Sequence, residues 1–247
     1  MKRPFLVLAL LFSASLPAQA PTAVSIPQEP HHHLVLENAY VRVFRVSVPA
    51  HESTLLHQHD VPYLYVSLGP ADVINAVQGK PEAHLVMADG QLGYSAGHFA
   101  HIARNESNVP FNNVTIELLR PQAEPHNLCE KVAPGDLGPC FKEDTGPRGY
   151  ASEPLFETKE LRAELITLQA KAKFVQKVAM GCLYMALDSA DLQDALGKPA
   201  IKLEPGDRFW VQAATILTLQ NTASSSARYL LLTVKHGTLR TKTEGAN

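Results

Sequence analysis

The chain has 247 residues, of which 45% are hydrophobic and 19% charged, a composition typical of a soluble globular protein with one large or two ordinary cores. Its formal net charge is -2. Without Lys2 and Arg3, which lie in a candidate leader, 20 basic residues face 24 acidic ones and the charge is -4. The sequence contains no Lys/Arg cluster of the kind that follows a phosphate backbone, which argues against a nucleic-acid partner.

Residues 1–20 have the pattern of a secretory signal peptide. Two basic residues precede an apolar run from Phe5 to Leu16, and Ala18-Gln19-Ala20 forms a small-x-small cleavage signal. We therefore expect an exported protein, periplasmic or secreted, that begins near Pro21. An uncleaved anchor is the alternative, but the apolar run is short for a membrane span. No later segment reaches that length, so we expect no membrane association after cleavage.

Export bears on the three cysteines. Cys129 and Cys140 bracket a short Pro/Gly-rich stretch, and in an oxidising compartment such a pair is expected to form a disulfide. Two free surface thiols are the alternative. Cys182 lies in an apolar run and is interpreted as a core residue rather than a nucleophile.

The remainder of the chain is strand-like. Short runs rich in β-branched, Leu and Tyr residues alternate with Gly, Pro, Asn and Asp, as in an antiparallel barrel or sandwich. The clearest runs cover residues 40–48, 63–68, 113–119, 164–170 and 229–234. The stretch from Pro121 to Gly149 is rich in Pro, Gly and charge and is interpreted as an inter-domain connection.

An internal repeat divides the strands into two copies. The segment YLYVSLGPADV, residues 63–73, resembles CLYMALDSADL, residues 182–192, at an offset of 119. Gly90 and Asn105 recur as Gly206 and Asn221 at an offset of 116. A three-residue indel between these two parts would account for the difference. Chance likeness between apolar strands is the alternative.

Ten of the eleven histidines lie at or before His126, so a histidine site would belong to the first copy. His57-Gln58-His59 is an H-x-H pair, and the period of two along a strand points both imidazoles to one face. His101 offers a third imidazole from a later strand. Imidazole is a ligand for Fe, Mn, Zn, Ni and Cu, and the pattern does not choose among these divalent transition metals.

These residues resemble the two motifs of the cupin superfamily. The first motif carries H-x-H followed by Glu, and the second carries glycines, a His and an Asn four residues later. His57, His59, His101 and Asn105 match, with Gly90 and Gly97 in the glycine positions. The resemblance, from about Leu34 to Lys235, implies two tandem cupin (jelly-roll) barrels and a metal on His57, His59 and His101.

The departures from the motifs concern the ligands and the turns. Pro62, Tyr63 and Leu64 stand where the family has its ligand Glu. Ala50 and Ser95 replace a motif Gly and a motif Pro, and His101 follows Gly97 by four residues instead of three. Three neutral imidazoles would leave two or three coordination positions open. Such a site resembles those of thiol dioxygenases and of some carbon–carbon-cleaving cupins, which use ferrous iron.

The second copy lacks this set, because the repeat aligns the three histidines with Gln176, Val178 and Leu217. We therefore expect a degenerate, packed barrel there. The predicted domains are a leader at 1–20, a first barrel at 21–122, a linker at 123–150, a second barrel at 151–240 and a tail at 241–247.

Several residues near the expected site are ambiguous. Tyr63 and Tyr65 share the parity of the H-x-H pair and are candidates for the cavity wall, with plain core packing as the alternative. His98 is a weaker candidate for the cavity. The run His31-His32-His33 is expected to be a solvated segment leading into the first strand, with adventitious metal binding as the alternative.

Three functions remain open at this point. The first is a metal-dependent dioxygenase or related enzyme acting on a small organic molecule, with no catalytic acid or base assignable. The second is a non-catalytic cupin that binds a small ligand or metal, and the third is a structural or assembly protein. The oligomeric state is also open, with a homodimer as one alternative.

Overall fold

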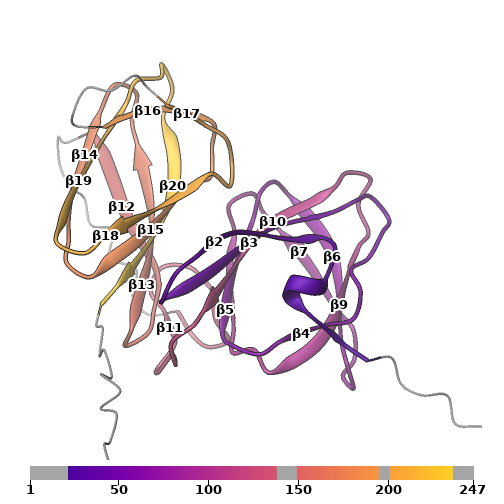
Figure 1. Cartoon of the computed structure of the whole chain (residues 1–247). Helices are drawn as coiled ribbons and strands as arrows, with labels where there is room; N and C mark the ends of the chain where they lie inside the picture. Colours follow the sequence, from indigo (N-terminus) through magenta and orange to yellow (C-terminus); the bar gives the residue numbers. More distant parts are fainter. Residues whose placement is uncertain (1–21, 138–148, 195–200, 236–247) are drawn as a thin grey trace, which may run out of the picture.

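The computed structural model describes residues 22–137, 149–194 and 201–235, and these residues form four β-sheets arranged as two sandwiches (Figure 1). The all-β prediction is confirmed. The leader, the tail, Cys140 and much of the connecting stretch lie outside the described residues, so the predicted disulfide, leader and domain limits stay predictions. Within the described ranges, no helix has the length and apolar character needed to cross a bilayer.

The first sandwich contains two five-stranded sheets, ordered β1-β4-β9-β6-β7 and β2-β3-β10-β5-β8. A single 3-10 turn, η1 (Ile26–Gln28), follows the first strand. The strands are β1 (Val24–Ser25), β2 (His32–Glu37), β3 (Val41–Val48), β4 (His57–His59), β5 (Tyr63–Ser67), β6 (Ala71–Val77), β7 (Ala83–Met87), β8 (Leu92–Ser95), β9 (Phe99–Asn105) and β10 (Phe111–Leu118).

The second sandwich contains a six-stranded sheet, β11-β12-β13-β20-β15-β18, and a four-stranded sheet, β14-β19-β16-β17. Its strands are β11 (His126–Asn127), β12 (Tyr150–Glu157), β13 (Leu161–Leu168), β14 (Lys173–Val178), β15 (Gly181–Ala186), β16 (Ala190–Asp194), β17 (Ile201–Leu203), β18 (Arg208–Gln212), β19 (Thr215–Asn221) and β20 (Ala227–Val234).

The two sandwiches are copies of one unit. The order β2-β3-β10-β5-β8 recurs as β12-β13-β20-β15-β18, and β4-β9-β6-β7 recurs as β14-β19-β16-β17. The register agrees as well, because His57 pairs with His101 as Gln176 pairs with Leu217. The internal repeat seen in the sequence is therefore a duplicated fold.

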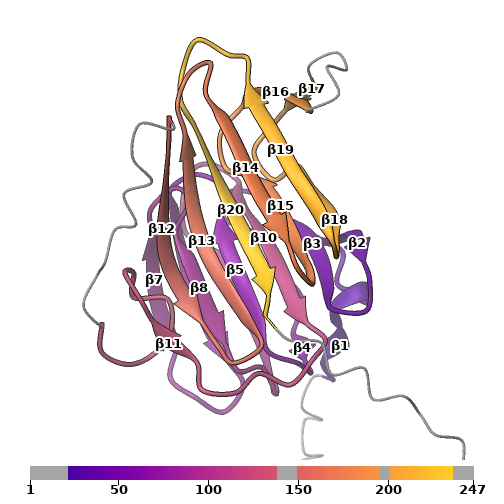
Figure 2. The same cartoon turned by 90° about the vertical axis from the view of Figure 1, so that its left-hand side faces the viewer.

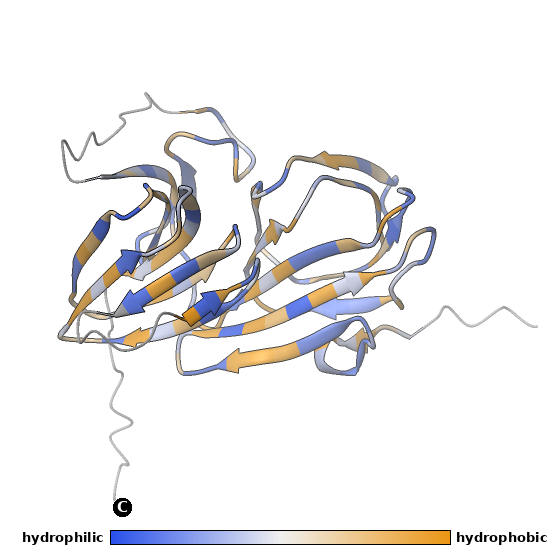
Figure 3. Cartoon of the chain, turned by 90° about the horizontal axis from the view of Figure 1, so that it is seen from above, coloured by the Kyte–Doolittle hydropathy of each residue, from blue (hydrophilic) through white to orange (hydrophobic). Residues whose placement is uncertain are grey.

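Alternation along the strands creates three apolar cores. On β10, Phe111 faces the interior of the first barrel, whereas Val114 and Ile116 face the opposite side. Each barrel has its own core, and the largest cluster lies between the barrels, where the β3-β10-β5 face meets the β13-β20-β15 face (Figure 2). The orange and blue bands along the strands in Figure 3 follow this period of two.

Specific contacts join the barrels across the shared core. Tyr40 stacks on Trp210 with ring centroids 5.5 Å apart, and Tyr94 lies 4.9 Å from Phe156. At the edge, Arg228 bridges Asp89 of the first barrel to Asp188 of the second. The second barrel thus covers an apolar face that the first barrel would otherwise expose.

Candidate metal centre

The three histidines expected from the sequence meet inside the first barrel. His57 and His59 lie on the same face of β4 and are 1% and 2% exposed, and His101 on the neighbouring β9 is 9% exposed. The turn before β9 sets this register. Gly97 has a φ of +73°, and a Cβ there would lie 2.2 Å from the carbonyl oxygen of Val61, so the turn needs glycine.

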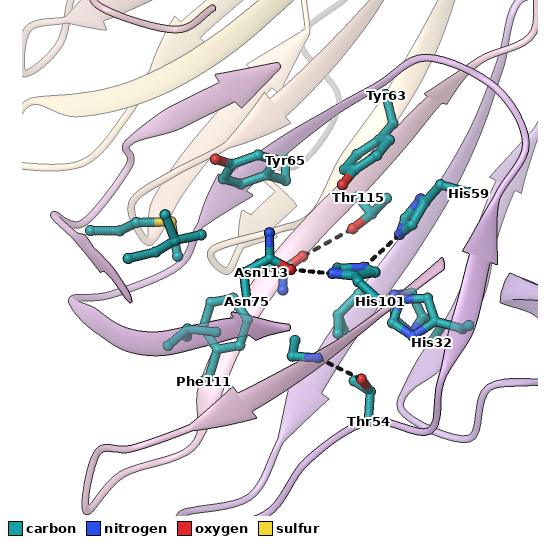
Figure 4. Close-up of a pocket in the computed structure, with 16 residues that line it drawn as sticks. His32, Thr54, His59, Tyr63, Tyr65, Asn75, His101, Phe111, Asn113 and Thr115 are labelled. Atoms are coloured by element: carbon teal, nitrogen blue, oxygen red, sulfur yellow. Dashed lines mark hydrogen bonds between the residues drawn. The ribbon is translucent and has the colours of Figure 1, made fainter. Parts of the chain in front are cut away.

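Hydrogen bonds fix which nitrogen is free in two of the three rings. His57 Nδ1 donates to the carbonyl oxygen of Leu55 at 2.9 Å, and His101 Nδ1 donates to Asn75 Oδ1 at 2.6 Å. Both rings therefore carry their lone pair on Nε2. His59 Nε2 lies 3.1 Å from His101 Nε2 (Figure 4). Within the described residues, the buried atoms His57 Nε2 and His59 Nδ1 have no hydrogen-bond partner.

A fourth histidine, His32, joins the cluster, and its expected place in a solvated segment was wrong. His32 is 8% exposed, and its ring centroid lies 4.8 Å from that of His57. The ligand nitrogens of His32, His57 and His59 all lie within 4.8 Å of one another. His32 Nδ1 contacts Glu29 Oε2 at 2.5 Å, and Glu29 is itself 1% exposed. His32 is buried on β2, whereas the next two residues, His33 and Leu34, are both exposed, so the strand gives no clean alternation that would have identified His32.

Burial keeps the imidazoles neutral. Desolvation, followed by the proximity of His32, lowers the pKa of His57 to about 4. Desolvation and the charge of His57 lower the pKa of His101 to about 3, and the pKa of His59 is lowered further for similar reasons. Neutral imidazole is the form that binds a metal ion. Burial destabilises the protonated imidazolium and therefore favours the neutral form.

The cluster opens into a cavity of about 80 Å³. Tyr63 and Tyr65 line it, and the Tyr63 ring stacks on His59 with centroids 4.0 Å apart. His98, by contrast, lies outside the cavity: it is exposed and has a φ of +62° in the turn that precedes β9. The other lining residues are His32, Val46, Thr54, His57, His59, Val73, Asn75, Leu85, Met87, His101, Ala103, Phe111, Asn113 and Thr115.

The donor set fits a transition metal. Two nitrogens about 2.1 Å from one ion lie about 3.0 Å apart on adjacent octahedral positions and about 3.4 Å apart on tetrahedral ones. The 3.1 Å between the Nε2 atoms of His59 and His101 falls within this range. No carboxylate lines the cavity. Glu52 and Asp60 are exposed, and the buried Glu117, which pairs with Tyr63 across β10 and β5, is not among the lining residues and forms an ion pair with Arg42.

The described residues of the second barrel contain no equivalent cluster. Val178 and Leu217 lie in its apolar core, together with Tyr184 and Tyr229. The expectation of a fully packed barrel needs one correction, because a hollow of about 470 Å³ lies among β16, β17, β18 and β19. Its described lining contains no His, Cys, Asp or Glu, so the hollow offers none of the usual metal ligands.

Comparison with known proteins identifies the fold. No family model matches the chain, and no curated protein matches it by sequence. Among solved structures, AerE from Microcystis aeruginosa is similar at a TM-score of 0.58 and 8% identity over 84% of this chain and 99% of that one. A cupin 2 conserved barrel domain protein from Leptotrichia buccalis has a TM-score of 0.51 and 11% identity over 83% and 88%.

A salicylate 1,2-dioxygenase from Pseudaminobacter salicylatoxidans is also similar, at a TM-score of 0.56 and 14% identity over 81% of this chain and 75% of that one. At these identities the likeness concerns the fold. The protein has a two-domain cupin fold, and its first domain carries a cluster of buried histidines suited to a metal.

Proposed function

We propose that the protein is an exported, metal-binding two-domain cupin whose first barrel binds one divalent transition metal through His57, His59 and His101. The observation that carries this proposal is the cluster of three buried imidazoles, in which His57 Nε2 has no hydrogen-bond partner and the Nε2 atoms of His59 and His101 contact each other at 3.1 Å. A buried nitrogen that lacks a hydrogen bond destabilises the fold, and a metal ion would satisfy several such nitrogens at once. Export is supported by the pattern of residues 1–20.

The surrounding residues would orient the ligands. The carbonyl of Leu55 and the side chain of Asn75 hold the Nδ1 protons of His57 and His101, which directs both Nε2 lone pairs inward. Tyr63 packs on the His59 ring and restricts its rotation. The described ligand set leaves coordination positions for water, oxygen or a chelating molecule, which a bound metal would polarise.

The reaction we propose is oxygenation of a small organic molecule. A cupin of the same fold is a salicylate 1,2-dioxygenase, and it has been crystallised as an adduct with gentisate. Neither Lys nor Arg is among the described residues that line this chain's cavity. A substrate carboxylate remote from the metal would find no counter-charge there, so we expect a compact substrate that is uncharged apart from its metal-binding atoms.

Metal analysis tests the binding step. We expect protein purified without a polyhistidine tag to contain about one transition metal per chain and the His101→Ala variant to contain almost none. His98→Ala is the matched control, because His98 lies three residues away but is exposed. Equal metal content in wild type and His101→Ala would refute the assignment.

Oxygen uptake tests the chemistry. Iron-loaded protein should consume oxygen with at least one compound in a panel of thiols, diketones and flavonoids. The small cavity favours a second candidate, non-catalytic binding of a metal or small ligand. A panel compound that raises the melting temperature without oxygen uptake would support that second candidate and exclude oxygenation of that compound.

A further inference from the structure

The segment before β2 lies against β4 and leads directly to His32. Val24 and Ser25 pair in parallel with His57 and Gln58, and Ile26 is buried in the barrel core. These contacts fix the segment on the strand that carries the H-x-H pair. We call residues 24–32 the N-terminal strap.

Glu29 is the centre of the strap. Its Oε2 accepts hydrogen bonds from His32 Nδ1 at 2.5 Å and from the backbone N–H of His31 at 2.9 Å. Its Oε1 accepts from the backbone N–H of Leu55 at 3.2 Å, and the carbonyl of Leu55 in turn holds His57. One buried carboxylate therefore orients two imidazoles of the cluster.

We propose that His32 is a fourth protein ligand of the metal and that Glu29, acting through His32, replaces the carboxylate ligand that the first motif lacks. The inference rests on the proposed metal site. In this arrangement the Glu29 carboxylate contacts His32 and not the metal itself. Glu29 holds the proton on His32 Nδ1, which leaves the lone pair on Nε2 free for the metal, as in carboxylate–histidine–metal triads. His32 would thereby be a ligand and Glu29 a positioning residue.

The distances allow this arrangement once the rings move closer together. Two nitrogens about 2.1 Å from one ion lie at most about 4.2 Å apart. The ligand atoms of His32, His57 and His59 lie within 4.8 Å of one another. Only opposite positions reach that limit, and on tetrahedral positions the nitrogens lie about 3.4 Å apart. Closure of a tetrahedral site would therefore need a contraction of up to about 1.4 Å, shared between two side chains that rotate about their χ angles.

The second copy lacks both members of the pair. Ser152 pairs with Ile166 in the register in which His32 pairs with Val46, so Ser152 occupies the position of His32. By the same offset, Gly149 stands where the first copy has Glu29. The pair therefore occurs only in the copy that contains the other three histidines, as a shared role predicts.

Metal affinity tests the proposal. Wild type, His32→Ala and Glu29→Gln are titrated with Co²⁺ in the presence of a competing chelator, and the visible absorption of bound Co²⁺ is recorded. We expect His32→Ala to weaken binding about 100-fold or more and Glu29→Gln to weaken it about 10- to 100-fold, each with a changed spectrum. His33→Ala is the matched control, because His33 is exposed on the same strand, and it should match wild type.

If His32→Ala does not fold, a measurement on the wild-type protein alone can still test the proposal. Pulsed electron paramagnetic resonance of the Cu²⁺-loaded protein counts coordinated imidazoles, and we expect four, with three in a folded His32→Ala variant. If wild type binds one metal through three imidazoles and Glu29→Gln binds it equally well, this proposal is overturned while the proposed metal site stands. If wild type binds no metal in the first barrel, both are overturned.

Discussion

The two barrels share a strand order but differ in the side chains that face the barrel interior. At four equivalent positions the first barrel has His32, His57, His59 and His101, where the second has Ser152, Gln176, Val178 and Leu217. On the opposite face the two copies agree: Leu64 and Val66 of β5, like Leu183 and Met185 of β15, enter the core between the barrels. The packing of the framework therefore does not depend on the histidine cluster, because the second copy keeps the same packing without it.

The comparison also indicates what the shared core contributes to the first barrel. Much of the first barrel's interior is polar and encloses the cavity, so its own buried apolar core is smaller than that of the second barrel. Polar residues around the cavity reduce the apolar core inside the first barrel, and the shared core adds apolar burial on its outer face. This arrangement assigns the second barrel a stabilising role.

The largest expected effect is the loss of bound metal when the three histidines of the first barrel are replaced by the equivalent residues of the second. The triple substitution His57→Gln, His59→Val and His101→Leu should reduce metal from about one per chain to none, while the β-sheet circular dichroism is retained. Gln58→Val is the control, because Gln58 lies between the two histidines on the other face of β4. Metal retained by the triple variant would place the site elsewhere.

Truncation of the shared core should be the most damaging change to stability. Phe156 is fully buried and contacts Tyr94 across the interface, so Phe156→Ala should lower the free energy of unfolding by about 3–5 kcal/mol. Urea unfolding should remain a single transition by circular dichroism and by fluorescence of Trp210, the one tryptophan of the chain. Val86→Ala, at a 70% exposed position, is the control and should change stability by less than about 0.5 kcal/mol. Two separated transitions would show that the barrels unfold independently.

Acid should destabilise the metal-free protein through the histidine cluster. The folded-state pKa is about 4 for His57 and about 3 for His101, below the ordinary value of about 6.5. Below pH of about 6.5 the unfolded chain takes up protons that the folded chain does not. Stability is therefore fully present above that pH and falls toward pH 4, by at most about 1.4 kcal/mol per histidine per pH unit.

Melting temperatures of metal-free protein at pH 7.5, 6 and 5 measure this effect. Melting temperature should fall less steeply with decreasing pH in the triple variant, because that variant lacks three of the buried histidines. If the two proteins lost stability in parallel, the acid sensitivity would arise outside the cluster.

A smaller loss of stability, of similar size in the two barrels, is expected on removal of the asparagine that both copies have at the equivalent position. Asn105 Nδ2 donates to the carbonyls of Val48, Pro49 and Val109, and Asn221 Nδ2 donates to those of Leu168, Gln169 and Ser225. Either Asn→Ala change should lower the free energy of unfolding by about 1–3 kcal/mol in denaturant titrations. Neither should change metal content, and loss of metal in Asn105→Ala alone would give that residue a role in the site.

Local patterns were sufficient to predict the fold and part of the site. The repeat of YLYVSL as CLYMAL identified β5 and β15, and the period of two placed His57 and His59 on one face. The extra residue between Gly97 and His101 is explained by the turn, where His98 also adopts a left-handed conformation and points its ring outward. Because a left-handed non-glycine residue has a weak sequence signal, the place of His98 could not be predicted.

His32 could not be predicted, because its position depends on pairing distant in sequence. A run of three histidines before a strand does not indicate which ring turns inward. The answer depends on the parallel pairing of β1 with β4 and on the buried Glu29, and neither has a periodic signal. The shared core was likewise hidden, since an apolar outer face on β10 shows that something covers it but not that the second copy does.

The central claim is that the first barrel alone holds a metal on converging imidazoles. Anomalous diffraction from a crystal of the metal-loaded protein, recorded on both sides of the metal's absorption edge, tests it most directly. The account predicts one strong peak per chain about 2.1 Å from nitrogens of His57, His59 and His101. A peak in the second barrel, a peak only at the exposed His33, or no peak in the first barrel would contradict it.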